Sequence, residues 1–264
     1  MAYEKVLLEF KDGIAFLKFN DPTVLNAVGP QMIAELGPAV QEVAASDARC
    51  LLISGEGRGF CSGANVADVN KRRAGGNSGG STSDALRSLY HPLLLSLRDL
   101  EMPIVTAVNG AAAGIGMSFA VRADIVCASK NAFFLQAFGR IGLVPDGGST
   151  FMLPRMVGWS RAIELSLLAE RLPAEKAFDW GIVNRLYDDQ DALMKGAWEI
   201  AGRLAKGPKS LALIRKAYWA TWSNGYEAQL DLEARLQKEA GRSADFKEGV
   251  LAFVEKREAR FTGE

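Results

Sequence analysis

The sequence predicts an α/β fold that ends in a helical part. Short apolar runs of strand type alternate with segments of helical periodicity as far as Leu186, and only helical segments follow it. The chain has 264 residues, of which 48% are hydrophobic and 23% charged. This length and composition suit one large packed domain, or a core with a modest appendage.

The N-terminal elements are predicted as a hairpin, a helix and a buried strand. Residues 6–10 and 14–19 have strand character and are joined by Asp12 and Gly13, a dipeptide typical of tight hairpins. Residues 50–53 form a further short strand. Between them, apolar residues recur at helical spacing: Met32, Ile33, Leu36, Val40 and Val43.

The middle of the chain continues the alternation. Residues 104–108 and 125–128 are strand-type runs, and the small-residue segment 110–123 between them is predicted to be helical. Residues 72–84 are rich in glycine and serine, so we expect a mobile loop there.

The end of the chain is predicted to be entirely helical. We expect a core over residues 1–200 and a helical module over residues 201–264. The helical segments are 191–206, 210–222, 226–240 and 244–260.

Charge and cysteine content narrow the class of protein. Thirty-one Lys and Arg balance thirty-one Asp and Glu, so no net field favours binding to nucleic acid or to a membrane surface. Cys50, Cys61 and Cys127 are an odd number at spacings that fit neither a disulfide framework nor a zinc site. No secretory signal and no membrane-spanning run is recognisable. We therefore expect a cytoplasmic protein.

The histidine count and the spacing of glycines exclude several metal-binding and catalytic motifs. His91 is the single histidine, which rules out multi-histidine metal sites within one chain, and no metal is predicted. Residues 76–80 satisfy G-x-S-x-G, but their flanks are of low complexity and provide no strand before the serine. Residues 110–116 follow a strand, yet Phe119 stands where a dinucleotide fingerprint needs its last glycine.

Two glycine-rich junctions remain as candidates for chemistry. Residues 59–65 follow the strand 50–53, and residues 108–116 follow the strand 104–108. Free N–H groups at two strand ends are what an oxyanion hole requires, because its donors must converge on one oxygen. The alternative is that small residues merely allow helices to pack tightly on a sheet.

Specific motifs resemble those of the crotonase (enoyl-CoA hydratase/isomerase) superfamily. FCSGANVADV, AVNGAAAGIGMSFAVRADIVCAS, IGLVPDGGSTFMLPRMVG, EKAFDWGIVNRL and FKEGVLAFVEKREARF occur in the family's order over the whole chain. The resemblance implies the ClpP/crotonase-like spiral of ββα turns with a helical C-terminal module. It also implies an acyl-CoA thioester substrate, whose enolate-type anion is stabilised by the backbone N–H groups of Ala64 and Ile115. No separate cofactor is expected, because coenzyme A is part of the substrate.

The same resemblance favours an isomerase over a hydratase. The family's hydratases use two glutamates, and the matching positions here are Ser118 and Phe138. The stretch QAFGRIGLVPDGG, which contains Asp146, resembles isomerases that act on ring-epoxide and unsaturated acyl-CoA intermediates of phenylacetate breakdown. Asp146 is therefore the expected base that moves a proton. Its alternative role is that of N-cap for a helix running through Met156.

Two rival functions stay open. In 4-chlorobenzoyl-CoA dehalogenases of the same superfamily, an aspartate and a histidine match Asp146 and the region of His91, but their assisting tryptophan matches Phe138. His91 otherwise suits a core or pocket-lining position. The absence of both glutamates also motivates a non-catalytic acyl-CoA binder.

The resemblance further implies where coenzyme A binds and how subunits assemble. Phe253 and Lys256 match residues that reach the nucleotide of a neighbouring subunit, in a homotrimer or a hexamer built as a dimer of trimers. Lys256 could equally be a solvated residue of an amphipathic helix. The other implied contacts are Leu25, Ala27, Ser62, Ala64, Asn65 and Val66. Candidates for an aromatic acyl wall, or simply for the core, are Phe133, Phe134, Phe138 and Phe151.

Overall fold

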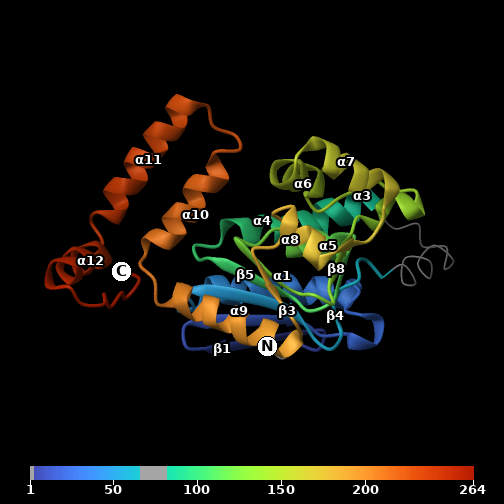
Figure 1. Cartoon of the computed structure of the whole chain (residues 1–264), viewed down its shortest axis with the longest axis horizontal. Coiled ribbons are helices and arrows are strands. Elements are labelled where there is room, and N and C mark those ends of the chain that lie inside the picture. The colour runs from blue at the N-terminus through green and yellow to red at the C-terminus, as the bar shows by residue number, and fades with distance from the viewer. Residues whose placement is uncertain (1–2, 66–81) are drawn as a thin grey trace.

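A six-stranded sheet and a four-stranded sheet form the centre of the computed structural model, which describes residues 3–65 and 82–264 (Figure 1). In the larger sheet, only the first pair of strands is antiparallel. Its strands, in spatial order, are β1 (Val6–Lys11), β2 (Ile14–Phe19), β3 (Cys50–Gly55), β5 (Ile104–Val108), β7 (Ile125–Ser129) and β10 (Arg185–Tyr187). The smaller sheet has the order β4 (Gly59–Cys61), β6 (Ala111–Ala113), β8 (Phe133–Leu135) and β9 (Leu172–Pro173).

The two sheets are linked by a repeated unit. Each of β3, β5 and β7 in the larger sheet is followed by one short strand, β4, β6 or β8, in the smaller sheet, and then by helical chain. The prediction of an α/β fold is thus confirmed, and the ββα repetition is visible in it. The remaining helical elements of the core are η1 (Pro22–Val24), α1 (Pro30–Ala44), α3 (Thr82–Ala85), η2 (Leu86–Tyr90), α4 (His91–Asp99), α5 (Ile115–Ala120), η3 (Ala137–Ile141), α6 (Ser149–Val157), α7 (Trp159–Leu168) and α8 (Ala174–Asp179).

The N-terminal hairpin and the first helix form as predicted. Asp12 and Gly13 have φ angles of 53° and 76°, the two positive values that a type I′ turn requires. The predicted apolar stripe of α1 is buried, from Met32 to Val43.

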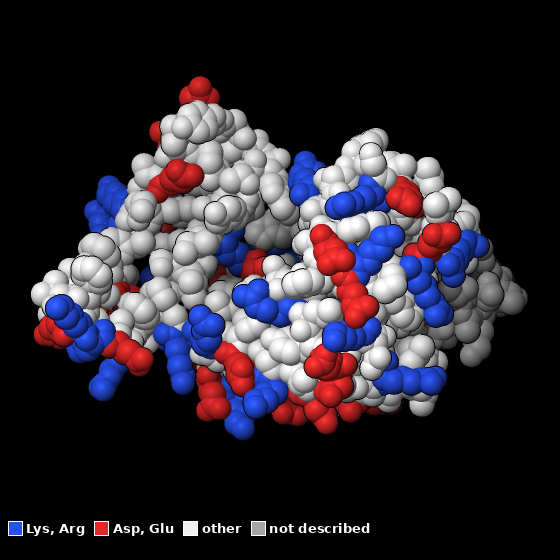
Figure 2. All heavy atoms as spheres, in the orientation of Figure 1, with Lys and Arg blue, Asp and Glu red and all other residues white. Residues whose placement is uncertain are grey.

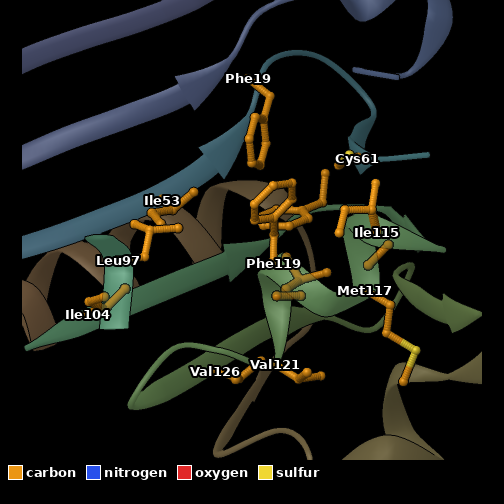
Figure 3. Packing of buried hydrophobic residues seen from close by; sticks show 14 of the residues in the cluster. Phe19, Ile53, Cys61, Leu97, Ile104, Ile115, Met117, Phe119, Val121 and Val126 are labelled. Atoms are coloured by element: carbon orange, nitrogen blue, oxygen red, sulfur yellow. The ribbon is translucent and has the colours of Figure 1, made fainter. Parts of the chain in front are cut away.

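One face of the larger sheet packs on α1, α4 and α5, where Phe19 and Phe119 meet with ring centroids 5.6 Å apart (Figure 3). The opposite face packs on α9 (Gln190–Ala205) through residues such as Phe16, Leu52 and Leu193.

The helix predicted over 110–123 is wrong in its first half. Ala111–Ala113 form β6, which pairs with β4 on one side and with β8 on the other, and α5 begins only at Ile115. A Cβ on Gly110 would lie 2.1 Å from the carbonyl oxygen of Arg58, so the backbone at this point must approach another strand closely. Pairing on both sides overrides the helical preference of alanine.

The C-terminal helices are α9, α10 (Ser210–Ala220), α11 (Tyr226–Ala240) and α12 (Ala244–Glu255). The boundary expected between residues 200 and 201 falls inside α9, because the buried face of that helix extends to Ala205. Figure 1 shows α10, α11 and α12 projecting from the core.

Two predictions fall outside the described residues. Most of the expected loop 72–84 lies there, and so does Val66. Among the residues that the structure does describe, no helix combines the length and the apolarity needed to cross a membrane.

Candidate active site

Two glycine turns bring the predicted backbone donors together. Gly63 and Gly114 have φ angles of 107° and 53°, which glycine adopts readily. A Cβ on Gly63 would lie 3.0 Å from the carbonyl oxygen of Ala113 and 3.9 Å from the Cα of Gly114. The residues that follow the two turns are Ala64 and Ile115, so their N–H groups belong to adjacent stretches of backbone.

Neither N–H group has an acceptor in the described part of the chain. Within residues 3–65 and 82–264, the amides of Ala64 and Ile115 donate to no acceptor. In contrast, the N–H groups of Val28 and Asn65, which form the β-bridge between Val28 and Ala64, both donate to backbone carbonyls. Ile115 is also the first residue of α5, where N–H groups point out of the helix without partners. The arrangement meets the requirement for two free donors.

Asp146 lies in the loop between η3 and α6, beside the Gly114 turn. The next residue, Gly147, has a φ of 62°, and a Cβ there would lie 2.4 Å from Cδ1 of Ile115 and 2.7 Å from Cβ of Ser118. The loop therefore packs directly on the first turn of α5, and glycine is needed for that contact. This places Asp146 next to the Gly114 turn.

The carboxyl group of Asp146 is half-buried and partly removed from water. Its Oδ1 atom is buried and has no hydrogen-bond partner among the described residues. Burial raises the pKa of Asp146 from its ordinary 3.8 to about 6. A carboxyl group with a pKa near working pH is suited to general base catalysis.

The alternative N-cap role of Asp146 is wrong. The residue before α6 is Gly148, and no side chain caps this helix. Only the backbone carbonyl of Asp146 takes part, accepting hydrogen bonds from the Ser149 N–H at 3.1 Å and from the hydroxyls of Ser149 and Ser118.

The two positions that match the family's glutamates lie at the same place. Ser118 is buried, and its Oγ donates to the carbonyl oxygen of Asp146 at 3.0 Å. Phe138 is buried with its Cζ 3.8 Å from the position of a Cβ on Gly114. The side chain at one position is thus engaged in holding the Asp146 loop, and the other offers an aromatic surface beside the Gly114 turn.

The predicted nucleotide-binding residues near the N-terminus form one connected strip. The Ser62 N–H donates to the carbonyl of Leu25, and the Val28 N–H donates to the carbonyl of Gly63, at 2.9 and 2.7 Å. Ala27 lies buried between them, and Asn65 continues the strip by donating to Val28.

Phe253 and Lys256 are not part of this strip. Both are exposed on or just after α12, and 86% of Phe253 is accessible. Figure 1 places α12 at the opposite end of the molecule from β4. A single chain therefore does not bring these two residues to the strip.

The other residues predicted from the sequence to line the site, His91 and the four phenylalanines, do not lie together. His91 is exposed at the first position of α4, so the expectation of a core position is wrong. Phe134 is fully buried, whereas Phe151 is partly exposed and packs on Trp222 with ring centroids 5.1 Å apart. Of the four expected wall residues, Phe138 is the one that lies against the Gly114 turn.

Two asparagines that position the site were not predicted from the sequence. Buried Asn26 donates to the carbonyls of Glu56 and Gly59, at 3.0 and 2.7 Å, and Asn109 donates to the carbonyl of Gly57 at 2.8 Å. Both amides hold the turn that leads into β4 and the Gly63 donor turn. Asn109 precedes Gly110, an N-G pair that signals a turn but does not tell which carbonyls it binds.

The charged side chains of the described residues form no patch of a single sign on the visible face (Figure 2). Figure 2 shows Lys and Arg interspersed with Asp and Glu over the visible face. In the described part of the chain, no group of three His, Cys, Asp or Glu side chains is placed to hold a metal ion. A cavity of about 1090 Å³ lies between the core and the C-terminal helices, with Phe151, Trp219 and Trp222 among its walls, but Asp146 does not line it.

Comparison with known proteins gives a consistent result. The sequence model of the family described as Enoyl-CoA hydratase/isomerase matches residues 9–264. The chain is 43% identical to a probable enoyl-CoA hydratase of Rhodobacter capsulatus over 265 residues, which covers 100% of both chains. It is 40% identical to the 1,2-epoxyphenylacetyl-CoA isomerase of Escherichia coli over 262 residues, covering 98% of this chain and 99% of the relative.

A solved structure is similar over the same extent. The crystal structure of a protein described as putative enoyl-CoA hydratase/isomerase from Mycobacterium abscessus aligns with a TM-score of 0.92 at 31% identity, covering 98% of this chain and 100% of that one. This likeness confirms the predicted spiral fold with its helical C-terminal part.

Proposed function

Because the chain belongs to the enoyl-CoA hydratase/isomerase family, we propose that it is an acyl-CoA isomerase that moves a proton between carbons of a thioester enolate. One observation carries the proposal: the half-buried Asp146, whose Oδ1 atom has no partner among the described residues, lies beside the Gly114 turn, which meets the Gly63 turn at the two free backbone donors.

The proposed mechanism uses three groups. The N–H groups of Ala64 and Ile115 donate to the thioester carbonyl oxygen of the substrate and stabilise the negative charge that develops there. The Asp146 carboxylate removes a proton from the carbon next to that carbonyl, and the electron pair of the broken C–H bond forms the enolate. In a 3-enoyl ester this enolate is conjugated with the existing double bond, so the carboxylic acid returns the proton to the far carbon of that double bond. The double bond then lies next to the thioester carbonyl, and the carboxylate is restored.

Residue chemistry supports isomerisation over hydration. Addition of water in the two-glutamate manner needs an acid and a base, and the matching positions carry the hydroxyl of Ser118 and the ring of Phe138, neither of which titrates near neutral pH. The relative at 43% identity is named a probable hydratase, and the relative at 40% identity is named an isomerase. The relative named as an isomerase supports a ring or unsaturated acyl intermediate of phenylacetate breakdown as the substrate.

We further propose that the active form is a homotrimer, or a hexamer of two trimers, in the cytoplasm. Exposed apolar residues on α12, such as Phe246 and Val250, support a contact between subunits. In such an assembly Phe253 and Lys256 would reach the nucleotide of the coenzyme A bound to a neighbouring subunit. Coenzyme A enters as part of the substrate, and no other cofactor is proposed.

A panel of coenzyme A esters tests the reaction class. We expect the protein to move a double bond in one or more 2-enoyl, 3-enoyl or aryl-CoA esters. Proton NMR locates the double bond in the product, and mass spectrometry shows whether the mass has changed. Net addition of water would identify a hydratase, and chloride release from 4-chlorobenzoyl-CoA a dehalogenase. Binding without turnover on every ester would identify a non-catalytic binder.

The Asp146→Asn variant tests the proposed base. Its kcat should fall by a factor of about 10² to 10⁴, as expected for loss of a general base, with little change in KM. His91→Asn is the matched control and should keep its rate. If the aspartate variant retained its rate while the histidine variant lost it, the mechanism would have to be rebuilt around His91.

A further inference from the structure

Arg122 is a buried cation without an acidic partner. It follows α5 directly, and only 8% of its surface is exposed. It forms no ion pair with any carboxylate of the described chain, and its Nε atom is buried without an acceptor. Burial, with a smaller contribution from Arg98 and Arg215, lowers the pKa of Arg122 to about 10. An unpaired buried charge is costly, so its retention needs a reason.

The guanidinium group of Arg122 lies under the Asp146 loop. One terminal nitrogen donates to the carbonyl oxygen of Gly147 at 2.9 Å and would lie 3.0 Å from a Cβ on Gly148. The other terminal nitrogen donates to the carbonyl oxygen of Leu94 in α4 at 3.4 Å. A single side chain therefore connects the residue after Asp146 to a neighbouring helix.

The Gly147 carbonyl has no second donor. Ser118 and Ser149 both donate to the carbonyl of Asp146, one peptide unit earlier. Among the residues described, Arg122 alone reaches the carbonyl of Gly147. Since Gly147 and Gly148 both have positive φ angles, this stretch has few side chains of its own to fix it.

We propose that Arg122 is a positioning residue for Asp146: it clamps the loop 146–148 against α4 and α5, so that the carboxyl group stays beside the Gly114 turn with its Oδ1 atom shielded from water. The inference rests on the proposed function in so far as Asp146 is the base. Arginine suits this task better than lysine, because its planar fork donates to two carbonyls at once.

No other charge explains the state of Asp146. The flanking elements η3 and α6 carry Arg140 and Arg155, both exposed, and Arg155 stacks on the ring of Phe151 at 3.8 Å. From α4, the titratable residues are His91, Arg98 and Asp99, all of them exposed. Burial is the one cause that raises the pKa of Asp146. Loosening the loop would therefore admit water and return that pKa toward its ordinary value.

The test follows the Asp146 carboxyl group directly. Protein labelled with ¹³C at the aspartate carboxyl carbon is titrated by NMR, with Asp146→Asn to assign the signal. In Arg122→Gln and Arg122→Met we expect the pKa of Asp146 to fall by about one unit or more. We also expect kcat to fall by a factor of about 10 to 100, with KM within about twofold, because a misplaced base affects the chemical step. Arg122→Lys keeps one donor and should show a smaller change in both quantities.

Arg215→Met is the control for loss of a buried arginine. Arg215 is 7% exposed and pairs with Asp124, so its removal should lower the melting temperature and leave the titration of Asp146 unchanged. If the Arg122 variants behaved like this control, Arg122 would be merely structural and the proposal would be overturned. An upward shift of the Asp146 pKa would also overturn it, since Arg122 would then act through its charge.

The design separates this proposal from the proposed function. If the wild-type protein turned over no ester, the isomerase assignment would fail, while the NMR titration would still decide whether Arg122 sets the environment of Asp146. If the methionine variant did not fold, the glutamine and lysine variants would carry the same comparison.

Discussion

Asp146 occupies an environment that changes both its reactivity and the stability of the fold. Its Oδ1 atom lacks a partner within residues 3–65 and 82–264, and the loop before it includes exposed apolar side chains such as Leu143 and Val144. Burial makes the carboxylate a stronger base than an ordinary aspartate. The same burial makes the charged form unfavourable in the folded protein.

The first consequence is a pH dependence of the rate. Only the carboxylate can take a proton, so kcat/KM should rise with pH through a pKa of about 6 and level off above it. The profile is measured between pH 4.5 and 8 on whichever ester the panel identifies. An acid limb near the ordinary aspartate value would show that the carboxyl group is hydrated in the working enzyme.

The second consequence concerns stability. The pKa of Asp146 is about 6 in the folded chain against an ordinary 3.8, so the folded state holds the proton more tightly and loses stability as pH rises through this window. Asp146→Asn carries no charge and should be more stable than the wild type at pH 7 to 8, by about 1 kcal/mol once partial exposure is discounted. Chemical denaturation at pH 4 and pH 7.5 measures the difference. An advantage of equal size at both values would show that the buried charge of Asp146 is not its cause.

The local sequence around Asp146 explains why its role was only half predictable. Asp-Gly-Gly-Ser before a helical segment is a plausible cap pattern. However, Gly147 and Gly148 take φ angles of 62° and 82°, which separate the Asp146 side chain from the start of α6. Such a turn depends on what packs under the glycines, here Ile115 and Arg122, and local sequence does not contain that information.

At the scale of elements, the close contact between α5 and β4 determines where the Ile115 donor lies. Figure 3 shows Cys61 and Ile115 on neighbouring elements of the core. A Cβ on Gly116 would lie 2.1 Å from the carbonyl oxygen of Cys61, so the helix can approach the strand only with glycine at this position. The distance between the two donor turns thus depends on glycine, which has no side chain, at position 116.

Gly116→Ala should therefore destabilise the fold by about 3 kcal/mol, because a backbone carbonyl cannot move away without shifting β4. Gly202→Ala is the matched control, since Gly202 lies inside α9 with nothing within 4 Å of its added Cβ. The control should gain about 0.5 to 1 kcal/mol from helix propensity. Urea unfolding of both variants measures the pair, and equal effects would show that the contact is not tight in solution.

Long elements were predictable and short ones were not. The stripe of α1, the strand β5 and the helix α11 follow from periodicity or β-branched runs of five residues or more. The strands β4 and β6 have three residues each, too few for a pattern, and consist of small side chains apart from Phe60. Their existence depends on strands distant in sequence, and the candidate site is built at their ends.

At the scale of the whole molecule, the C-terminal helices carry large apolar side chains that are exposed in a single chain. Phe253 and Val254 are 86% and 71% exposed, and Trp159 and Leu167 on the core are 73% and 75% exposed. We expect light scattering of the purified protein to give a mass of three or six chains of 28.5 kDa. The mass of one chain in dilute solution would contradict the proposed assembly.

Two surface substitutions sharpen that test. Val250→Lys on α12 should lower the assembly state, because it places a charge in the expected contact. Lys195→Ala on α9 is a surface control and should leave the mass unchanged. Loss of assembly in both variants would indicate unfolding instead of a broken contact.

The order of strands in both sheets follows the order of synthesis. In β1-β2-β3-β5-β7-β10 and in β4-β6-β8-β9, every strand joins the edge left by its predecessor, and none has to be inserted between two earlier strands. A nascent chain can therefore extend both sheets as it leaves the ribosome. The sheet face that contains Phe16, Leu52 and Val105 is buried later than the sheet is formed, because it packs on α9, which ends at Ala205. Until that helix emerges, a growing chain that already contains all the strands of both sheets presents a bare apolar face, and this is the stage at which chaperones would have most to bind.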